Sequence, residues 1–561
     1  MSALLQQPQK LQQIDIIKIY EKKRCLVVDD LTEVRALYKR MLRSFGVREL
    51  DTAATSDQTM GLCHNHNYGI IICDYNLDDS RDGQQILEEL RHMEMLKYTT
   101  LFIIITAETS REMVLGAIEN QPDDYITKPI SQKLMRTRLD RALLKHEDLF
   151  SIKLSMDSKN YSKAIKLCDE KIKSKNRYAI DCIRYKAQIY MMMGKPEEAQ
   201  KIYESMLRQR HYAWAKIGLA KALMAAGKYE NIEPLLKETL KEDHRYIEAH
   251  DLLADFYEKT NEPEKAQLAV EKATELSPKS IIRHRRLAQL AEENGDDVAC
   301  LKAYEESIRW NYNSCHATPE DYLSLARKTV DVAKTASPRE AVDKTKKALG
   351  LLERMQRRFP ERKNKVKSTF IESQLYACQG KENLAKSLLK KAERVYGILD
   401  PKDTDARLDY SCAHIMSGDK QKAYKELHLL SKEKKDSVSV LRRIDRISEE
   451  PISFEGKSCA AELSKAGINA YQKREYDKSI KIFGDALKMF PNHVGVNLNL
   501  VQVIIAKAEI DGKQNEHYLR SKECFSKVGA LASDHKQYTR HQFLFKQFNE
   551  VYKDYQSMQS Q

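Results

Sequence analysis

The first 150 residues alternate between short apolar runs and longer segments in which apolar side chains recur at helical spacing. Four runs have the length and composition of buried strands: residues 24–30, 69–74, 101–106 and 124–129. A fifth run, residues 47–52, gives a weaker strand signal. Helical spacing occupies residues 32–45 and resumes after Asp82-Gly83. Strands that are apolar throughout and separated by helices are typical of a parallel sheet covered on both faces. The pattern therefore predicts an α/β domain.

From about residue 150 onward the pattern changes to pairs of helices that repeat every 34 residues or so, at roughly the length of known helical-hairpin repeats. One helix of each pair carries a mostly small residue at a matching position: Ala164, Ala199, Ile232, Ala266, Cys300, Ala341, Ala385, Ala423, Ser479 and Ser521. The residue twelve positions earlier, on the partner helix, is usually small as well: Ala187, Ala220, Ala254, Ala288, Ser373, Ser411 and Gly467. Small residues let neighbouring helices pass closely, so the pattern predicts an all-α solenoid.

Composition agrees with a helix-rich chain. Glycine and proline number only 19 and 13 of 561 residues. So few turn-forming residues exclude a large all-β protein, a collagenous chain and a Pro/Gly-rich disordered chain. An apolar fraction of 42% is enough to build folded cores.

Charge divides the chain into two unlike parts. Residues 1–150 carry 20 basic and 23 acidic side chains, whereas the remainder carries 75 and 59, so their net charges are −3 and +16. A basic excess is compatible with nucleic-acid binding, with an acidic protein partner or simply with solvated helical faces. Because no helix-turn-helix or other nucleic-acid reader motif accompanies it, nucleic-acid binding is the alternative and not the leading hypothesis.

Eleven cysteines are scattered from Cys25 to Cys524 with no CxxC pair and no Cys/His cluster at zinc spacing. Cys63, with His64 and His66 beside it, is interpreted as an ordinary loop or helix end. Unpaired cysteines at apolar positions are typical of a reducing compartment. The chain also shows no signal peptide and no apolar run of about 18 residues. We therefore expect a cytoplasmic protein.

Polar side chains stand where the apolar runs of the first part end: Asp29, Asp30, Asp74, Thr106 and Lys128. The carboxyl ends of parallel strands meet at one edge of a sheet, where ligands bind. Three carboxylates there repel one another unless a cation joins them, and oxygen ligands of this kind suit Mg²⁺. A carboxylate can also attack phosphorus and form an aspartyl phosphate. A lysine ammonium and a threonine hydroxyl are the expected partners of the phosphoryl oxygens.

With these residues, Tyr125 and Lys128-Pro129, residues 22–148 resemble a response-regulator receiver domain of two-component signalling, with a flavodoxin-like (βα)5 fold. The resemblance implies that Asp74 is the phosphoacceptor and that Lys128 pairs with the phosphoryl group. It also implies that Thr106 and Tyr125 form a switch pair and that the Lys128–Pro129 peptide bond is cis. The implied Mg²⁺ ligands are Asp29, Asp30, Asp74 and the backbone carbonyl of Asn76.

The loop after Asp74 departs from the family pattern. Leu77-Asp78 stands where the family usually has Met-Pro, and Gly83 follows Asp74 by nine residues instead of eight. The loop therefore has one extra residue and the added acids Asp78, Asp79 and Asp82. The nucleophile Asp74 is intact, but this loop leaves the lifetime of the phosphorylated form and the affinity for the metal undetermined.

Residues 148–535 resemble a tetratricopeptide-repeat array of about nine or ten units, irregular between residues 305 and 460. The best unit runs from Ala466 to Ser479 and continues through Phe483, Ala486, Leu487 and Pro491. The resemblance implies protein binding on a concave surface and no catalysis. Five histidines of this part are interpreted as lacking a convergent Cys or carboxylate set: His211, His244, His250, His284 and His316. Trp214 and Trp310 are interpreted as packing residues.

The predicted order of the chain is an N-terminal extension, a receiver, a repeat array, and a capping helix with a tail, at residues 1–21, 22–148, 149–535 and 536–561. No Gly-, Pro- or Ser-rich linker follows the last receiver helix, residues 131–148, so we expect it to run almost directly into the first repeat helix.

The leading functional hypothesis is a bacterial response regulator that accepts a phosphoryl group from a histidine kinase or phosphotransfer protein and acts by binding a protein target. That target could itself belong to a phosphorelay. The protein is not expected to be an enzyme beyond its own aspartyl phosphorylation and dephosphorylation. A nucleic-acid-binding output and a phosphate sink for a kinase remain alternatives, and a homodimer stays open.

Overall fold

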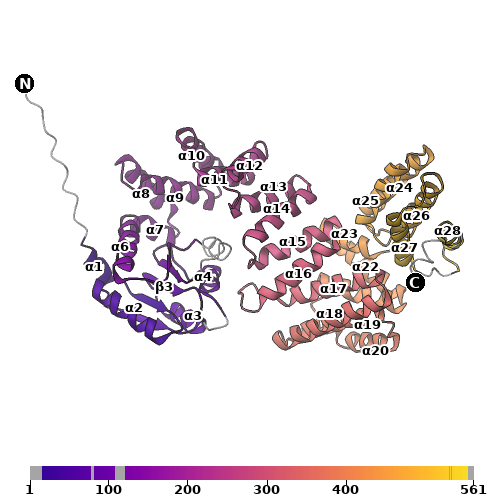
Figure 1. The fold of residues 1–561 in the computed structure, drawn as a ribbon, viewed down its shortest axis with the longest axis horizontal. Coiled ribbons are helices and arrows are strands. Elements are labelled where there is room, and N and C mark those ends of the chain that lie inside the picture. The colour runs from indigo at the N-terminus through magenta and orange to yellow at the C-terminus, as the bar shows by residue number, and fades with distance from the viewer. Residues whose placement is uncertain (1–14, 78–80, 108–120, 530, 532, 554–561) are drawn as a thin grey trace, which may run out of the picture. The chain divides into compact units, whose positions relative to one another are not determined.

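The computed structural model describes residues 15–77, 81–107, 121–529, 531 and 533–553 (Figure 1). The chain divides into two compact units. The first comprises Met1–Arg286 together with Arg309–Ala317, and the second comprises Leu287–Ile308 together with Thr318–Gln561. The first unit therefore contains the sheet, the helices that cover it and the helices that follow directly.

A five-stranded parallel sheet lies in the first unit with the strand order β2-β1-β3-β4-β5. The strands follow the apolar runs: β1 Cys25–Val28, β2 Leu50–Ala53, β3 Ile70–Asp74, β4 Leu101–Thr106 and β5 Asp124–Thr127. The α/β prediction is confirmed, including the weaker strand after residue 47. All strands point the same way, so their carboxyl ends share one edge.

Both faces of the sheet are buried because successive side chains of a strand point to opposite faces. Cys25, Val27, Ile70 and Ile72 belong to one buried cluster, with helices α2 (Thr32–Phe45) and α6 (Gln132–Asp148). Leu26, Val28, Ile71 and Cys73 belong to the other, with α3 (Ser56–Asn65) and α4 (Gly83–His92). This double burial explains why the strands are apolar throughout and do not alternate.

A short helix, α1 (Ile16–Lys22), precedes the first strand. Its Tyr20 side chain is fully buried, and the Tyr20 hydroxyl donates a hydrogen bond of 2.8 Å to Asp140 on α6. Part of the predicted N-terminal extension is therefore packed against the sheet domain, which the sequence pattern did not reveal.

The junction between the sheet domain and the following helices is nearly continuous. Helix α6 ends at Asp148, and α7 (Phe150–Asp157) begins after the single residue Leu149. The Leu149 N–H still bonds to the Lys145 carbonyl, and the Leu149 side chain is fully buried. The prediction that this helix runs almost directly into the next is confirmed.

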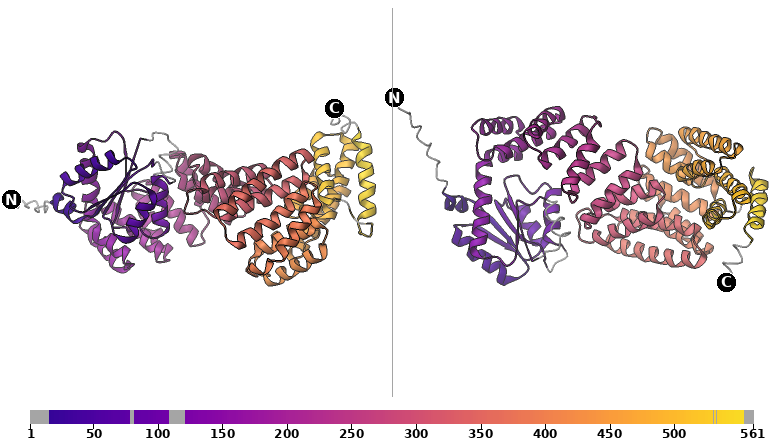
Figure 2. Two further views of the ribbon diagram at one scale, coloured as in Figure 1. Left: turned by 90° about the horizontal axis from the view of Figure 1, so that it is seen from below. Right: turned by 45° about the horizontal axis from the view of Figure 1, so that its top comes forward.

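The rest of the chain is helical, and within each unit most consecutive helices pack side by side (Figures 1 and 2). The helices of this part and one 3-10 turn are α8 Tyr161–Lys173, α9 Ala179–Met192, α10 Pro196–Gln209, α11 Ala213–Ala225, α12 Ile232–Glu242, α13 Ile247–Lys259, α14 Pro263–Leu276, α15 Ile281–Asn294, α16 Asp297–Asn311, α17 Pro319–Thr335, α18 Pro338–Arg358, α19 Arg362–Cys378, α20 Glu382–Glu393, η1 Tyr396–Ile398, α21 Thr404–Ser417, α22 Lys420–Glu433, α23 Val438–Ile447, α24 Phe454–Gln472, α25 Tyr476–Met489, α26 Val494–Asp511, α27 Asn515–Val528 and α28 Tyr538–Val551. Among the described residues, none of these helices combines the length and apolar character that a membrane crossing requires.

The small residues spaced twelve positions apart lie where paired helices approach most closely. In the α24–α25 pair, the Ser479 hydroxyl donates a 2.8 Å hydrogen bond to the Gly467 carbonyl. In the α19–α20 pair, the Ser373 hydroxyl donates an equally short bond to the Ala385 carbonyl. A side-chain hydroxyl can reach the backbone of the neighbouring helix only when the two helices almost touch, so these positions must stay small.

We predict that Gly467→Ala destabilises the second unit, because the new Cβ would lie 2.5 Å from the buried ring of Phe483. Overpacking of this kind lowers the free energy of unfolding by about 1–3 kcal/mol. Gly350→Ala is the matched control, because Gly350 is an exposed residue inside α18 with no neighbour within 4 Å of the new Cβ. Loss of a helical glycine there should stabilise by up to about 1 kcal/mol. Urea unfolding followed by circular dichroism should separate the two variants, and equal midpoints would show that the helix contact is not tight.

Candidate functional site

Three carboxylates converge at the carboxyl edge of the sheet. Asp29 and Asp30 follow β1, and Asp74 is the last residue of β3. Each offers an oxygen atom, and these three atoms lie within 4.8 Å of one another. Asp29 is fully buried and Asp74 is only 6% exposed. The structure therefore brings together the acidic residues that the strand-end pattern singled out.

Among the described residues, Lys128 supplies the ammonium group that contacts this cluster. Its Nζ atom donates a 2.9 Å hydrogen bond to Asp74 and lies 3.5 Å from Asp29. Lys128 follows β5, and its N–H bonds to the Thr106 carbonyl at the end of β4 at 2.6 Å. The Lys128–Pro129 peptide bond is cis. The ends of β4 and β5 thus hold Lys128 against the acidic pair.

The other predicted site residues lie around this group. Thr106 is fully buried at the end of β4, and Tyr125 is half-buried on β5. Tyr125 packs against the cluster that contains Tyr75. Asn76 follows Asp74 by two residues and is exposed. Asp78 and Asp79 lie outside the described residues.

The electrostatics of the cluster reflect burial of like charges. Burial raises the pKa of Asp74 to about 6, with a further increase from Asp29 and an opposing effect from Lys128. Burial also raises the pKa of Asp29, against the hydrogen bond from Leu31 and the charge of Lys128. For Lys128, burial lowers the pKa, but Asp74 and Asp29 outweigh burial and raise it. One ammonium group does not fully compensate the carboxylates.

Local hydrogen bonds fix the first pair of acids. The Leu31 N–H donates to an Asp29 carboxylate oxygen at 2.9 Å. The Arg35 guanidinium on α2 donates to the carbonyls of Asp29 at 2.7 Å and Asp30 at 2.8 Å. These bonds fold the chain between β1 and α2 so that both carboxylates stay at the sheet edge.

Gly83 closes the loop that follows Asp74. A Cβ at this position would lie 2.3 Å from the Asp74 carbonyl oxygen, so only glycine fits without a shift of the backbone. The Gly83 N–H bonds to the Tyr75 carbonyl at 2.8 Å. Asp82 then caps α4 by accepting from the Gln85 N–H. The longer loop thus still returns to the end of β3.

The acidic cluster is suited to a divalent cation. Its donors are carboxylate oxygens from two adjacent strand ends, which is the donor type that Mg²⁺ prefers. The raised pKa values of Asp74 and Asp29 also show that a further positive charge would be favourable there. The residues that could hold it are Asp29, Asp30 and Asp74, with the Asn76 carbonyl as the predicted additional ligand.

A lysine from the helical part contacts the same loop. Lys279, between α14 and α15, donates hydrogen bonds to Asp82 at 2.7 Å and to the Tyr75 hydroxyl at 3.1 Å. Its Nζ atom also lies 5.1 Å from the centre of the Tyr75 ring and 5.7 Å from that of Trp310. Burial lowers the pKa of Lys279, but Asp82 and Tyr75 raise it by more. The sequence pattern gave no sign of this contact.

The interpretation of His316 as lacking convergent ligands is wrong. Its ring lies beside Cys315 and beside Glu88 of α4, and these three side chains each offer a donor atom within 4.8 Å of the others. Glu88 is separated from the Cys-His pair by most of the first unit's sequence, so no local spacing could reveal the group.

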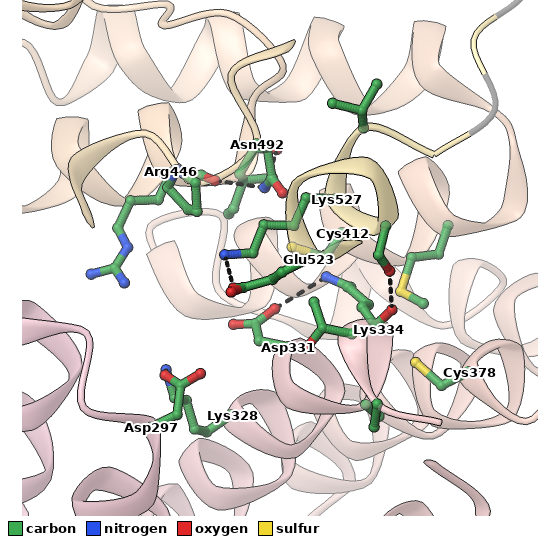
Figure 3. A pocket seen from close by; sticks show the side chains of 18 of the residues that line it. Asp297, Lys328, Asp331, Lys334, Cys378, Cys412, Arg446, Asn492, Glu523 and Lys527 are labelled. Carbon is green, nitrogen blue, oxygen red and sulfur yellow. Dashed lines mark hydrogen bonds and ion pairs between the residues drawn. The ribbon is translucent and has the colours of Figure 1, made fainter. Parts of the chain in front are cut away.

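A cavity of about 990 Å³ with both polar and apolar lining lies among helices of the second unit (Figure 3). Lysines and acids line it in pairs, among them Lys334 with Asp331 at 3.1 Å and Lys527 with Glu523 at 2.6 Å. The Ser526 hydroxyl donates to the Lys334 carbonyl, which joins α27 to α17 across the cavity. A hollow with charges of both signs suits a polypeptide better than a uniformly anionic ligand.

Comparison with known proteins bears on the sheet domain. Residues 25–140 match the family described as the response regulator receiver domain. The chemotaxis protein CheY of Pseudomonas aeruginosa is 24% identical over 118 residues, which are 21% of this chain and 94% of that protein. CheY-3 of Vibrio cholerae is 26% identical over 118 residues, 21% of this chain and 89% of that protein.

Among solved structures, the response regulator TrrA of Thermotoga maritima in complex with Mg²⁺ and BeF is 26% identical, with a TM-score of 0.19. That match covers 21% of this chain and 98% of TrrA. The family match and the similarity to the two CheY proteins identify residues 25–140 as a receiver domain of the CheY-like kind. All of these matches leave the helical part uncovered.

We predict that the full chain binds Mg²⁺ at the acidic cluster and that Asp29→Asn weakens binding at least about tenfold, or about 1.4 kcal/mol. Loss of one buried charged ligand reduces the attraction for the cation. Asp57→Asn is the control, since its side chain is 86% exposed and lies outside the cluster while the charge change is the same. Isothermal titration calorimetry measures both, and equal loss of affinity in the two variants would place the cation elsewhere.

Proposed function

We propose that the protein is a response regulator whose receiver accepts a phosphoryl group on Asp74 from a histidine kinase or a phosphotransfer protein. The observation that carries this proposal is the 2.9 Å contact of Lys128 with Asp74 beside the buried Asp29. In the transfer, an Asp74 oxygen forms a bond to phosphorus as the bond between phosphorus and the donor imidazole breaks. Lys128 then balances the charge of the phosphoryl oxygens.

Asp29, Asp30, Asp74 and the Asn76 carbonyl would hold Mg²⁺ beside the reacting oxygen. When bound, the ion neutralises charge on the phosphoryl group. The chain's own residues orient the nucleophile. The hydrogen bond from Lys128 directs one Asp74 oxygen inward, and the Gly83 contact keeps the following loop close. Thr106 and Tyr125 are the proposed switch pair.

The helical part is proposed to be a tetratricopeptide-repeat array that binds a protein target, with the receiver at residues 22–148, the array at 149–535 and the cap at 536–561. The close pairing of helices at Gly467 and Ser479 supports this assignment. The mixed charge of the cavity in the second unit favours a protein ligand. The basic excess of residues 151–561 keeps nucleic acid as a second candidate, which steep salt dependence of binding would favour.

Tyr75 offers a route from the phosphoacceptor to the repeats. It follows Asp74 directly, is 1% exposed, and packs in the same cluster as Tyr125. Its hydroxyl accepts a hydrogen bond from Lys279 at 3.1 Å. A phosphoryl group on Asp74 needs room and hydrogen-bond donors from the loop that begins at Tyr75. Movement of that loop would weaken its contact with Lys279, so the helical part would sense the modification.

Linkage gives this route a thermodynamic consequence. If phosphorylation weakens the Lys279 contact, then loss of the contact must favour phosphorylation by the same factor. The contact with Lys279, between α14 and α15, would therefore favour the unphosphorylated form of the receiver. A target that binds the helical part only when the Lys279 contact is broken would also favour the phosphorylated receiver.

We expect Asp74→Asn to abolish phosphoryl incorporation, because the amide cannot act as the nucleophile. Mass spectrometry of the intact chain after incubation with a small phosphoryl donor and Mg²⁺ should show one added group in the wild type and none in the variant. Asp57→Asn removes an exposed carboxylate of the same domain and should leave incorporation unchanged. Incorporation that persists in Asp74→Asn would contradict the assignment of the phosphoacceptor.

A further inference from the structure

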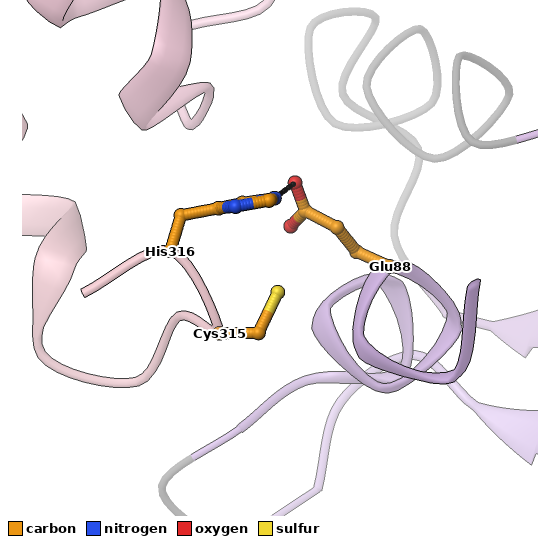
Figure 4. Close-up of side chains that lie close together, drawn as sticks. All are labelled: Glu88, Cys315 and His316. Carbon is orange, nitrogen blue, oxygen red and sulfur yellow. Dashed lines mark ion pairs between the residues drawn. The ribbon is translucent and has the colours of Figure 1, made fainter. Parts of the chain in front are cut away.

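Two segments far apart in the sequence bring metal-binding side chains together (Figure 4). Glu88 lies on α4 of the receiver, and Cys315 and His316 lie between α16 and α17. The His316 Nε2 atom is 3.2 Å from a Glu88 carboxylate oxygen, and the Cys315 sulfur is within 4.8 Å of both ligand atoms. All three residues belong to the first compact unit.

His92 lies beside this group. It lies four residues after Glu88 on α4, and side chains four apart share one face of a helix. The centre of its exposed ring is 4.9 Å from that of His316, with the two rings at 70° to each other. The group thus contains one sulfur, one imidazole and one carboxylate, and a second imidazole stands next to it.

The turn that carries Cys315 and His316 is held by its own hydrogen bonds. The His316 N–H donates to the Ser314 hydroxyl at 3.1 Å, and the Ala317 N–H donates to the Ser314 carbonyl at 3.1 Å. The Arg285 guanidinium donates to the His316 carbonyl. The side chains of His316 and Glu88 are 18% and 30% exposed. The donors are therefore positioned by the backbone and partly shielded from water.

Zinc fits this donor set better than magnesium does. Zn²⁺ binds Cys, His and carboxylate ligands in tetrahedral geometry, whereas Mg²⁺ takes oxygen ligands. Two ligands of a tetrahedral zinc stand about 3.4 Å apart when each bond is about 2.1 Å long. The observed 3.2 Å between His316 and Glu88 is close to that separation.

Burial and neighbouring charges shift the pKa of two of these donors. Burial lowers the pKa of His316, with His92 and Arg285 adding to the effect, so the imidazole is held in the neutral form that metals bind. Burial also raises the pKa of Cys315 to about 11, with added effects of Glu88 and Glu89. The thiol therefore stays protonated until a metal displaces its proton into solvent.

We propose that Glu88, Cys315 and His316, with His92 as fourth ligand after a side-chain rotation, form a Zn²⁺ site that joins the receiver helix α4 to the turn between α16 and α17. The site is separate from the acidic cluster at Asp74. One bound ion would cross-link two segments of the first unit and stabilise their contact by mass action.

The test uses the full chain, stripped with a chelator and titrated with Zn²⁺ against a chromogenic competitor. We expect one tight equivalent per chain, with at least tenfold weaker binding in Cys315→Ser and in His316→Asn, and weaker binding in His92→Asn. Cys63→Ser is the matched control, because Cys63 also precedes a histidine but belongs to no cluster of metal-binding donors within the described residues. It should bind like the wild type.

Cobalt gives a second readout that a merely structural effect would not produce. Co²⁺ bound to the wild type should show a thiolate-to-metal charge-transfer band, which Cys315→Ser should lose while its circular dichroism stays native. Absence of a tight zinc equivalent, or the same zinc affinity in Cys315→Ser, His316→Asn and Cys63→Ser, would overturn the proposal. Unchanged affinity in His92→Asn would overturn the assignment of the fourth ligand.

Discussion

Two buried carboxylates that share one ammonium group are the constraint on which the rest of the receiver depends. Asp29 and Asp74 meet because β1 and β3 are adjacent parallel strands that end at the same edge. Lys128 reaches both, yet the pKa of Asp74 remains raised to about 6 because burial outweighs this help. Such a cluster responds strongly to any added charge, since buried charges are poorly screened. That sensitivity makes it suited to a cation and a phosphoryl group.

The same edge is connected to the helices that follow. Tyr75 comes directly after Asp74, and Lys279 bonds both to it and to Asp82 at the other end of the same loop. Helix α6 passes into α7 with only Leu149 between them, so the covalent connection is short as well. A change at Asp74 therefore has two ways to reach the helical part. One is through the loop contact, and the other is through the helix junction.

The strand-end residues could be predicted from the sequence because a parallel sheet places every carboxyl end at one edge. The apolar runs showed where the strands end, and so they predicted that Asp29, Asp74 and Lys128 meet at that edge. The contact of Lys279 with Asp82 spans 197 residues, and that of His316 with Glu88 is as distant in the sequence. Such pairs depend on how folded segments meet, which periodicity does not encode. Helix α1 escaped prediction because it has only 7 residues, too few for helical spacing to be recognised.

The central claim is that the helices sense the state of Asp74 through Lys279. Hydrogen exchange of the full chain, with and without a phosphoryl donor, tests it most directly at α4 and at residues 276–286. Exchange there should become faster on phosphorylation of the wild type, should not change in Asp74→Asn, and should already be fast in Lys279→Met. Lys272→Met alters an exposed lysine of α14 and should behave like the wild type. Phosphorylation that leaves exchange at residues 276–286 unchanged would contradict the account.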